Sequence, residues 1–326
     1  MKDFQSARLQ CAGSVLMIRP VSFDYNPQTA ATNKMQQPQE YAVATPGAQA
    51  RKPDSMVAQE EFDRLAQALQ SEGVAVCVAA DTADPPKPDA VFPNNWVSFH
   101  EDGTVVLYPM QAENRRRERR LEIVDAVVEQ LGFKMARRVD LTHHEAQGRF
   151  LEGTGSLILD RVHRVAYASV SQRTHPAVVE EWCGELGYAP VVFESFDRSG
   201  VPLYHTNVLM CIGEQFAVVG TGAIPERDRE RVLERLCATG RELIEIGHEE
   251  IAHFAGNMLE LASWDEALGD CRVVVMSDSA RHALSAKAFS RLSACTDTVL
   301  AVPLPTIERL GGGSVRCMLA EVFLPA

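Results

Sequence analysis

Five short segments of this 326-residue chain share one pattern, in which a small or amide residue precedes an apolar run. Apolar runs of this length, bounded by turn residues, are typical of buried strands. The segments begin 60, 52, 50 and 57 positions apart, so the pattern recurs along most of the chain. They are residues 95–99, 155–159, 207–211, 257–261 and 314–319.

Further elements complete each repeated unit. Several segments are followed by a turn and a second apolar run, as at 104–108 and 216–219, which predicts a hairpin. Helical patterns lie between the hairpins, at 55–69, 121–131, from 174 onward, 227–236 and 280–292. Five ββαβ-type units predict an α/β fold with radial repetition, a five-bladed α/β propeller, because that arrangement leaves only short sheet edges. An α/β layered protein with evenly spaced strands is the alternative.

Charge and composition exclude several classes of function. The formal net charge of −12 repels phosphate backbones, so we expect no nucleic-acid partner. The run Arg115–Arg120 is interpreted as the solvated start of the helix that follows it. No apolar stretch approaches the roughly 18 residues of a membrane span, so no membrane association is expected. The run at 15–18 is too short for a secretory segment.

The eight cysteines are scattered and form no C-x-x-C pair, which favours reduced thiols in the cytoplasm. The doublet His143-His144 is predicted not to bind metal, since adjacent side chains point in different directions on a helix or a strand. Residues 23–53 are poor in large apolar side chains and predict a lid, with a binding loop or disorder as alternatives. Residues 1–10 are expected to be a disordered N-terminal end.

Three chemically active side chains lie at the beginning of apolar runs of this kind or just before them. Cys317 follows the glycine run 311–313, His205 lies in Y-H-T-N, and Glu152 lies in F-L-E-G-T-G. A thiol, an imidazole and a carboxylate are the components of nucleophilic catalysis. The alternatives are structural, because a free cysteine is usually a small buried hydrophobe. For His205 the alternative is a side chain that caps a strand by hydrogen-bonding the backbone, and for Glu152 it is an acid on the surface.

Six segments in chain order resemble the guanidino-modifying superfamily, which includes arginine deiminases, dimethylargininases and amidinotransferases. Among its members they look most like the citrulline utilization hydrolases. The segments are L-M-I-R-P (16–20), F-P-N-N-W (92–96), R-F-L-E-G-T-G-S (149–156), Y-H-T-N (204–207), F-A-G-N-M-L (254–259) and G-G-G-S-V-R-C-M (311–318).

The resemblance implies a five-bladed α/β propeller, or pentein, with the active site on its central axis. Residues 11–326 are then expected to form a single catalytic domain. By the same resemblance, Cys317 is the nucleophile and His205 the general acid and base. Glu152 orients His205 or holds the terminal nitrogen of the substrate. No metal and no organic cofactor is implied.

The departures from the superfamily pattern bear on the substrate. Where arginine deiminases carry two aspartates, this sequence has Asn95, with Asn94 beside it, and Asn207. A buried guanidinium that faces amides lacks its charge partners, whereas a neutral ureido group can both accept from and donate to an amide. We therefore expect citrulline as substrate, cleaved through an S-carbamoyl enzyme to ornithine, carbon dioxide and ammonia.

The amino-acid end of such a substrate requires a cation for its carboxylate. Arg149 and Arg198 are the candidates, because guanidinium binds carboxylate bidentately. Asp89 either serves the amine or only ends a loop, and Arg316 is expected to be structural.

Two other functions remain as alternatives to citrulline hydrolysis. One is an arginine deiminase, dimethylargininase or amidinotransferase acting on a cationic guanidino substrate. The other is a binding protein without activity, which the presence of cysteine, histidine and glutamate disfavours. The partner in either enzymatic case is a small amino acid. The sequence does not set the oligomeric state, for which a homodimer is one alternative.

Overall fold

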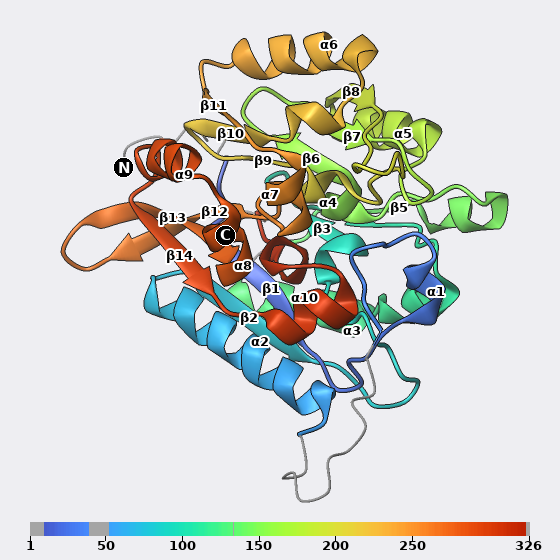
Figure 1. Ribbon diagram of the computed structural model, residues 1–326. Helices are drawn as coiled ribbons and strands as arrows, with labels where there is room; N and C mark the ends of the chain where they lie inside the picture. The colour runs from blue at the N-terminus through green and yellow to red at the C-terminus, as the bar shows by residue number, and fades with distance from the viewer. Residues whose placement is uncertain (1–9, 39–51, 133, 324–326) are drawn as a thin grey trace, which may run out of the picture.

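The computed structural model describes residues 10–38, 52–132 and 134–323 of the chain. It has a mixed α/β architecture, with five three-stranded sheets flanked by helices (Figure 1). In each sheet the central strand pairs antiparallel with one neighbour and parallel with the other. The sheets are β15-β1-β2, β3-β4-β5, β6-β7-β8, β9-β10-β11 and β12-β13-β14.

The strands are short, as expected for small repeated units. Their bounds are β1 Ser14–Arg19, β2 Ala75–Ala80, β3 Val97–Phe99, β4 Thr104–Leu107, β5 Arg137–Asp140, β6 Leu157–Asp160, β7 Val165–Ser169, β8 Ala189–Phe193, β9 Met210–Ile212, β10 Phe216–Val219, β11 Glu242–Glu245, β12 Leu259–Asp265, β13 Gly269–Ser277, β14 Thr298–Val302 and β15 Ala320–Glu321.

One sheet joins the two ends of the described chain. The last strand, β15, pairs antiparallel with the first, β1, with Val15 opposite Glu321 and Leu16 opposite Ala320. The strand β1 then pairs in parallel with β2 over Ser14–Arg19. The fifth unit is therefore assembled from both ends of the chain, and its ββαβ order matches that of the other four.

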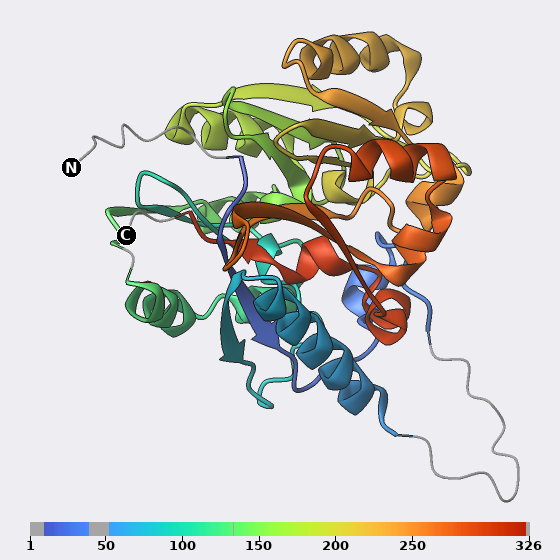
Figure 2. The same ribbon diagram turned by 90° about the vertical axis from the view of Figure 1, so that its left-hand side faces the viewer.

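The longer helices form where the apolar positions recur at helical spacing. In α2 (Asp54–Ser71), Phe62, Leu65 and Leu69 are buried, and both views show this helix lying across β1 and β2 (Figures 1 and 2). Burying each such side chain stabilises the fold by about 2 kcal/mol. The other long helices are α3 Leu121–Leu131, α5 Pro176–Leu186 and α6 Glu226–Cys237, close to the predicted ranges.

The prediction of one continuous helix at 280–292 is wrong. It is divided into α8 (Asp278–Ala283) and α9 (Ala286–Ser293). The reason is a second N-cap, since Ser285 has extended backbone and its side chain accepts a hydrogen bond from the amide of Ala288.

The predicted strands also begin later than expected. Short helical turns occupy the heads of the first three segments or the residues just before them, α7 lies a few residues ahead of the fourth segment, and a further turn includes Cys317. These turns are η1 Pro93–Asn95, α4 Gly153–Ser156, η4 Thr206–Val208, α7 His248–Ala252 and η6 Val315–Met318. The side chains assigned to the site therefore lie on turns and loop residues, not within strands.

The segment predicted to be a lid is described only in part. Residues 23–38 include the short helix α1 (Pro27–Ala30), and Phe23, Asn26 and Asn33 are buried against the rest of the molecule. Residues 39–51 lie outside the described part, as do residues 1–9 of the predicted disordered end. Gln10 is described and buried, and its amide donates to Leu159 and Ile212 carbonyls.

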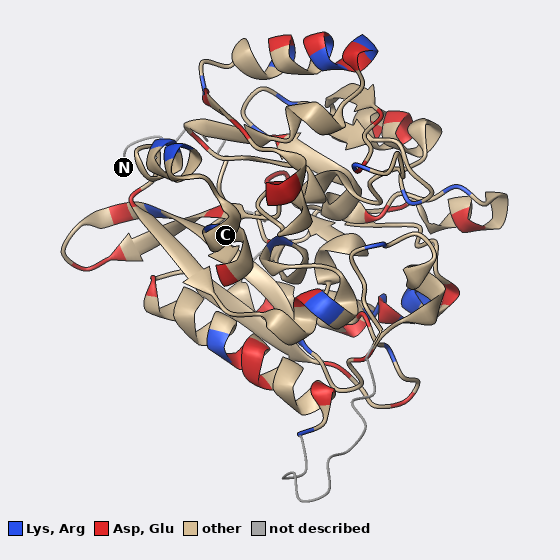
Figure 3. Ribbon diagram, in the orientation of Figure 1, with Lys and Arg blue, Asp and Glu red and all other residues tan. Residues whose placement is uncertain are grey.

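The charged side chains are mixed in sign along the outer helices, as α2 and α6 show in Figure 3. Within residues 10–38, 52–132 and 134–323, no helix has both the length and the apolar character that crossing a bilayer requires. All eight cysteines are described, and each is a free thiol.

The turn that carries the candidate catalytic glutamate depends on Gly153, and this dependence is testable. Gly153 has φ +49°, and an added Cβ would lie 2.1 Å from the carbonyl oxygen of Asn94. We expect Gly153→Ala to lower the free energy of unfolding by about 3 kcal/mol, through backbone strain plus overpacking. Urea denaturation measures the change.

Gly187 provides the matched control for this substitution. Its φ is +70°, but the nearest atom to an added Cβ is the Arg164 side chain at 3.5 Å, an ordinary contact. Gly187→Ala should therefore cost only about 1 kcal/mol, the backbone contribution. Equal losses at the two positions would contradict the close approach of the turn to Asn94.

Candidate active site

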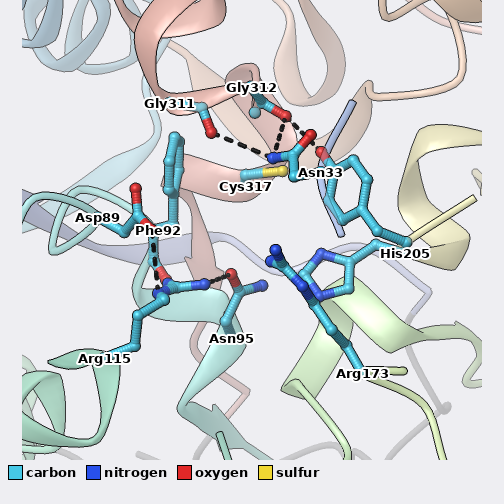
Figure 4. A pocket seen from close by; sticks show the side chains of 12 residues that line it. Asn33, Asp89, Phe92, Asn95, Arg115, Arg173, His205, Gly311, Gly312 and Cys317 are labelled. Carbon is cyan, nitrogen blue, oxygen red and sulfur yellow. Dashed lines mark hydrogen bonds and ion pairs between the residues drawn. The ribbon is translucent and has the colours of Figure 1, made fainter. Parts of the chain in front are cut away.

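A pocket with a free volume of about 10 Å³, room for about one water molecule, brings together residues from distant parts of the sequence (Figure 4). Cys317 lies near its centre, between the glycine loop on one side and Asn95 and Arg173 on the other. The lining residues are Asn33, Asp89, Phe92, Asn95, Arg115, Arg173, Tyr204, His205, Gly311, Gly312, Gly313 and Cys317.

The thiol of Cys317 is 3% exposed and lies within reach of two amide donors. The Nδ2 atoms of Asn207 and Asn257 are 3.4 Å and 3.3 Å from its sulfur. Asn257 is itself fixed, since it donates to the Asn207 carbonyl at 3.0 Å and accepts from the Arg316 amide at 3.1 Å. The Oδ1 of Asn257 lies 3.7 Å from the sulfur and can accept from the thiol, so the two amides hold the sulfur in position.

A buried histidine–carboxylate pair lies on the same cavity. His205 Nε2 is 2.8 Å from Glu152 Oε2, and the two side chains are 2% and 0% exposed. Because an ionised carboxylate only accepts hydrogen bonds, Nε2 carries the proton and Nδ1 has the free lone pair. This arrangement gives His205 the tautomer of a general base.

Burial and neighbouring charges act in opposite directions on the pKa values of His205 and Glu152. Burial lowers the pKa of His205 to about 4, although the hydrogen bond to Glu152 opposes that shift. Burial alone would raise the pKa of Glu152, but the charge of Arg173 and the hydrogen bond from His205 hold that pKa well below its usual value. At neutral pH the pair is therefore a neutral imidazole on an ionised carboxylate.

The prediction that the basic run 115–120 is a solvated helix start is wrong for Arg115, which is buried. Residues 113–118 form the 3₁₀ helix η2, and Arg115 is 2% exposed. Its guanidinium donates bidentately to Glu118 at 2.9 Å and to Asn95 Oδ1 at 2.9 Å. Three residues per turn place Arg115 and Glu118 on one face, which turns inward. The sequence showed only a charged run, with no sign that Arg115 and Glu118 pair in the interior.

Arg149 and Arg198, the predicted carboxylate-binding residues, do not line the cavity. Arg149 is exposed. Arg198 is 70% exposed and pairs with Glu249 at 3.6 Å. Nearness in sequence to Glu152 and His205 misled the prediction, because the chain turns sharply between each arginine and the site.

Arg173 is the cavity arginine that the sequence gave no reason to select. Its Nη1 lies 3.5 Å from Glu152, and its Nη2 donates to Thr32 Oγ1 at 2.7 Å and to the Thr29 carbonyl at 2.9 Å. The guanidinium also lies 5.2 Å from the centre of the Tyr204 ring. It thus ties the described part of the predicted lid to the candidate catalytic carboxylate.

The predicted amides are all buried, but they differ in position. Asn95 lines the cavity and donates to Asn94 Oδ1 at 3.0 Å, while Asn94 and Asn207 are not among the lining residues. Within the described residues, Asn94 Nδ2 and Asn207 Oδ1 have no hydrogen-bond partner. Asn257, which belongs to a quoted motif, had been given no role, although it heads one of the five repeats.

Asp89 is part of the cavity wall, so the simpler reading of it as a loop end is incomplete. Its Oδ2 accepts from Asn26 at 2.7 Å and lies 3.7 Å from Arg115. Its Oδ1 is buried with no hydrogen-bond partner among the described residues. Burial raises the pKa of Asp89, against the opposing charge of Arg115. Arg316, by contrast, pairs with Glu321 at 2.9 Å, a structural role.

The glycine loop is held down over the sulfur by two polar side chains. Asn33 donates to the carbonyls of Gly311 and Gly312 at 3.3 Å and 3.1 Å, as Figure 4 shows. The hydroxyl of Tyr204 donates to the Gly312 carbonyl as well. These contacts close the cavity, so a substrate has to displace them in order to enter.

Comparison with known proteins defines the class first. The matching family profile, over residues 19–324, together with solved structures of the same fold, confirms the resemblance to the guanidino-modifying, or pentein, superfamily seen in the sequence. The chain belongs to the family described as "N,N dimethylarginine dimethylhydrolase, eukaryotic", whose sequence profile matches residues 19–324. Among curated proteins no significant match was found.

Three solved structures illustrate the similarity. The product-bound N-terminal domain of ArgZ, described as an arginine dihydrolase from the ornithine–ammonia cycle in Cyanobacteria, is 19% identical with a TM-score of 0.68, over 96% of this chain and 99% of that one. Unliganded AgrE is 20% identical with a TM-score of 0.69, over 96% and 39%. A DDAH from Pseudomonas aeruginosa complexed with citrulline is 16% identical with a TM-score of 0.63, over 95% and 99%. The chain thus spans about 39% of AgrE.

The low pKa of His205 predicts a specific loss of stability in acid. Folding lowers this pKa from 6.5 to about 4, so the unfolded state binds more protons between those values. The contribution is fully present above pH 6.5 and is lost as the pH falls towards 4. We expect a loss of up to about 3 kcal/mol, measured by urea unfolding across this window.

In His205→Gln this part of the acid slope should disappear. His253→Gln, at an exposed position, is the control and should retain the wild-type slope. A His205→Gln variant with an unchanged slope between pH 6.5 and 4 would mean that His205 is not buried as a neutral base.

Proposed function

We propose that this protein is a cysteine-dependent C–N hydrolase that acts on the ureido or guanidino group of an arginine-related amino acid. Citrulline, cleaved to ornithine, carbon dioxide and ammonia, is the substrate that we favour. Residues 11–326 then form one catalytic domain, a five-bladed propeller of the five sheets, in which β15–β1 pairing closes the ring. The presence of five sheets with one strand order supports this arrangement.

The chemistry assigns one task to each member of the site. Cys317 is the nucleophile, and the side-chain amides of Asn207 and Asn257 donate to its sulfur. As the sulfur attacks the ureido carbon, the thiol gives its proton to Nδ1 of His205, and His205 passes that proton to the ornithine nitrogen as the C–N bond breaks. An S-carbamoyl enzyme remains. Water, deprotonated by His205, attacks the same carbon, so that carbamate leaves and the thiol is regenerated.

The amides around the sulfur are the observation that carries the choice of a neutral substrate. Asn95, Asn207 and Asn257 surround the reaction centre, where carboxylates would be needed to balance a guanidinium. The lining carboxylate Asp89 is already engaged with Asn26 and Arg115, and the nearby carboxylate of Glu152 is engaged with His205 and Arg173. The unpartnered Oδ1 of Asn207 suits a ureido N–H donor.

We also propose how the amino-acid end is held. Arg173 replaces Arg149 and Arg198 as the carboxylate-binding residue, because it is the cavity arginine whose Nη1 has only a long contact, at 3.5 Å. The free Oδ1 of Asp89 would accept from the α-amine. Both groups are buried, so each would bind a complementary charge strongly once it is desolvated.

An arginine-type substrate is the second candidate, and the comparisons favour it. The family profile is that of a dimethylarginine hydrolase, and ArgZ is described as an arginine dihydrolase. An enzyme that hydrolyses a guanidino group and then the resulting ureido group would use the same thiol twice. For this chain, Asp89 and Glu152 would have to offset the charge of the guanidinium.

Ligand preference in a non-reacting variant distinguishes these two candidates. In Cys317→Ser we expect citrulline to bind at least about tenfold more tightly than arginine, as measured by calorimetry. Adding Asn95→Asp and Asn207→Asp should reverse that preference, since two carboxylates then face the bound group. Using the serine variant removes any effect of the new charges on the thiolate.

The matched control is Asn94→Asp, which changes a buried amide that is hydrogen-bonded to Asn95 and not to Cys317. It should leave the preference for citrulline nearly unchanged. Tighter binding of arginine by Cys317→Ser itself, or no reversal in the double aspartate variant, would count against a neutral substrate. Wild-type turnover of citrulline to ornithine, absent in Cys317→Ser, tests the hydrolase assignment separately.

A further inference from the structure

Two adjacent histidines and a glutamate form a cluster on the surface, away from the catalytic cavity. His143 and His144 lie on the 3₁₀ helix η3 (Thr142–Gln147), and Glu181 lies on α5. His144 Nε2 is 2.8 Å from Glu181 Oε2, and His143 Nε2 is 3.7 Å from Glu181 Oε1. One ligand atom from each of the three residues lies within 4.8 Å of the other two.

This geometry removes the reason for which the sequence excluded a metal site here. Adjacent side chains were expected to point apart, as they do on a strand or an α-helix. In the tight turn of η3 the two imidazole rings instead lie face to face, with centroids 4.2 Å apart and planes inclined by 35°. Both rings therefore present Nε2 to the same carboxylate.

The ring of His143 is already oriented for ligation by its other nitrogen. Nδ1 of His143 lies 3.2 Å from the backbone carbonyl of Asp140. A carbonyl accepts only, so Nδ1 carries the proton and Nε2 keeps its lone pair. A hydrogen bond from the second ring nitrogen to a carbonyl is the usual support of a metal-bound histidine.

We propose that His143, His144 and Glu181 bind a divalent transition-metal ion of the zinc or nickel type. Two imidazole nitrogens and a carboxylate oxygen are ligands that such ions accept, with water in the fourth position. Ligand atoms around tetrahedral zinc are about 3.3 Å apart, so the longest separation in the cluster, up to 4.8 Å, has to shorten by about 1.5 Å. His143 and Glu181 are free to move by that amount, because their side chains are 55% and 41% exposed.

The ion would join two segments that deliver residues to the catalytic cavity. The chain from η3 leads to Glu152, and α5 is preceded by Arg173. These segments already meet, since the Glu152 amide donates to the Arg173 carbonyl at 3.2 Å and the His175 amide to the Phe150 carbonyl at 2.8 Å. A metal bridge from His144 to Glu181 would reinforce the same junction from outside.

Calorimetry with Ni²⁺ tests the site, because imidazole ligands favour nickel while soft thiolates compete less for it. We expect one ion per wild-type chain, with binding at least about tenfold weaker in His143→Ala and in Glu181→Gln. Saturating Ni²⁺ should also slow amide hydrogen exchange in residues 142–152 of the wild type and not of His143→Ala. Both variants alter exposed side chains, so they should fold.

His253→Ala is the matched control. His253 and Glu249 form an exposed histidine–carboxylate pair at 3.8 Å that belongs to no three-residue cluster among the described residues. Its removal should leave Ni²⁺ affinity and stoichiometry unchanged. Equal affinity in the wild type and His143→Ala, or no binding up to about 1 mM Ni²⁺, would overturn the proposal.

Discussion

The ionised carboxylate of Glu152 is the interaction on which the rest of the site depends. It is 0% exposed, and the desolvation of such a charge costs several kcal/mol unless it is compensated. His205 and the arginines 173 and 115 provide that compensation, at 2.8, 3.5 and 3.7 Å. The same contacts fix the tautomer of His205, hold Arg173 on the cavity wall and bring Arg115 to Asn95. The buried charge of Glu152 therefore fixes the positions of His205 and Arg173 and, through Arg115, of Asn95.

Around the thiol the repeat supplies neutral donors instead of further charges. Asn95, Asn207 and Asn257 each occupy the head of one repeated unit, at the turn that precedes its first strand. Because equivalent turns from different units meet at one place, equivalent side chains meet there too. Their amides leave the sulfur without a carboxylate neighbour among its hydrogen-bond partners, which favours an uncharged reacting group.

Periodicity predicted the architecture because it reports burial over many residues. The five units, their ββαβ order and helices at 121–131 and 55–69 were predicted from apolar spacing, and the motifs selected Cys317, His205 and Glu152 as candidates. Local chemistry was harder to predict. Arg115 was misread because a run of charges does not reveal a 3₁₀ turn, and Arg173 occurs in no motif. The helix break before Ser285 required a cap that propensity alone does not show. The lid, the compartment and the oligomeric state remain predictions.

The central claim is that Cys317 forms a covalent bond to the ureido carbon of the substrate, with His205 as the base. Mass spectrometry of enzyme quenched during citrulline turnover tests it directly. The account predicts a carbamoyl group on the peptide that contains Cys317, absent from the other seven cysteines and more abundant in His205→Gln if acylation still proceeds. An amidino adduct would instead indicate a guanidino substrate. No adduct on Cys317 in an enzyme that converts citrulline would contradict the nucleophilic mechanism.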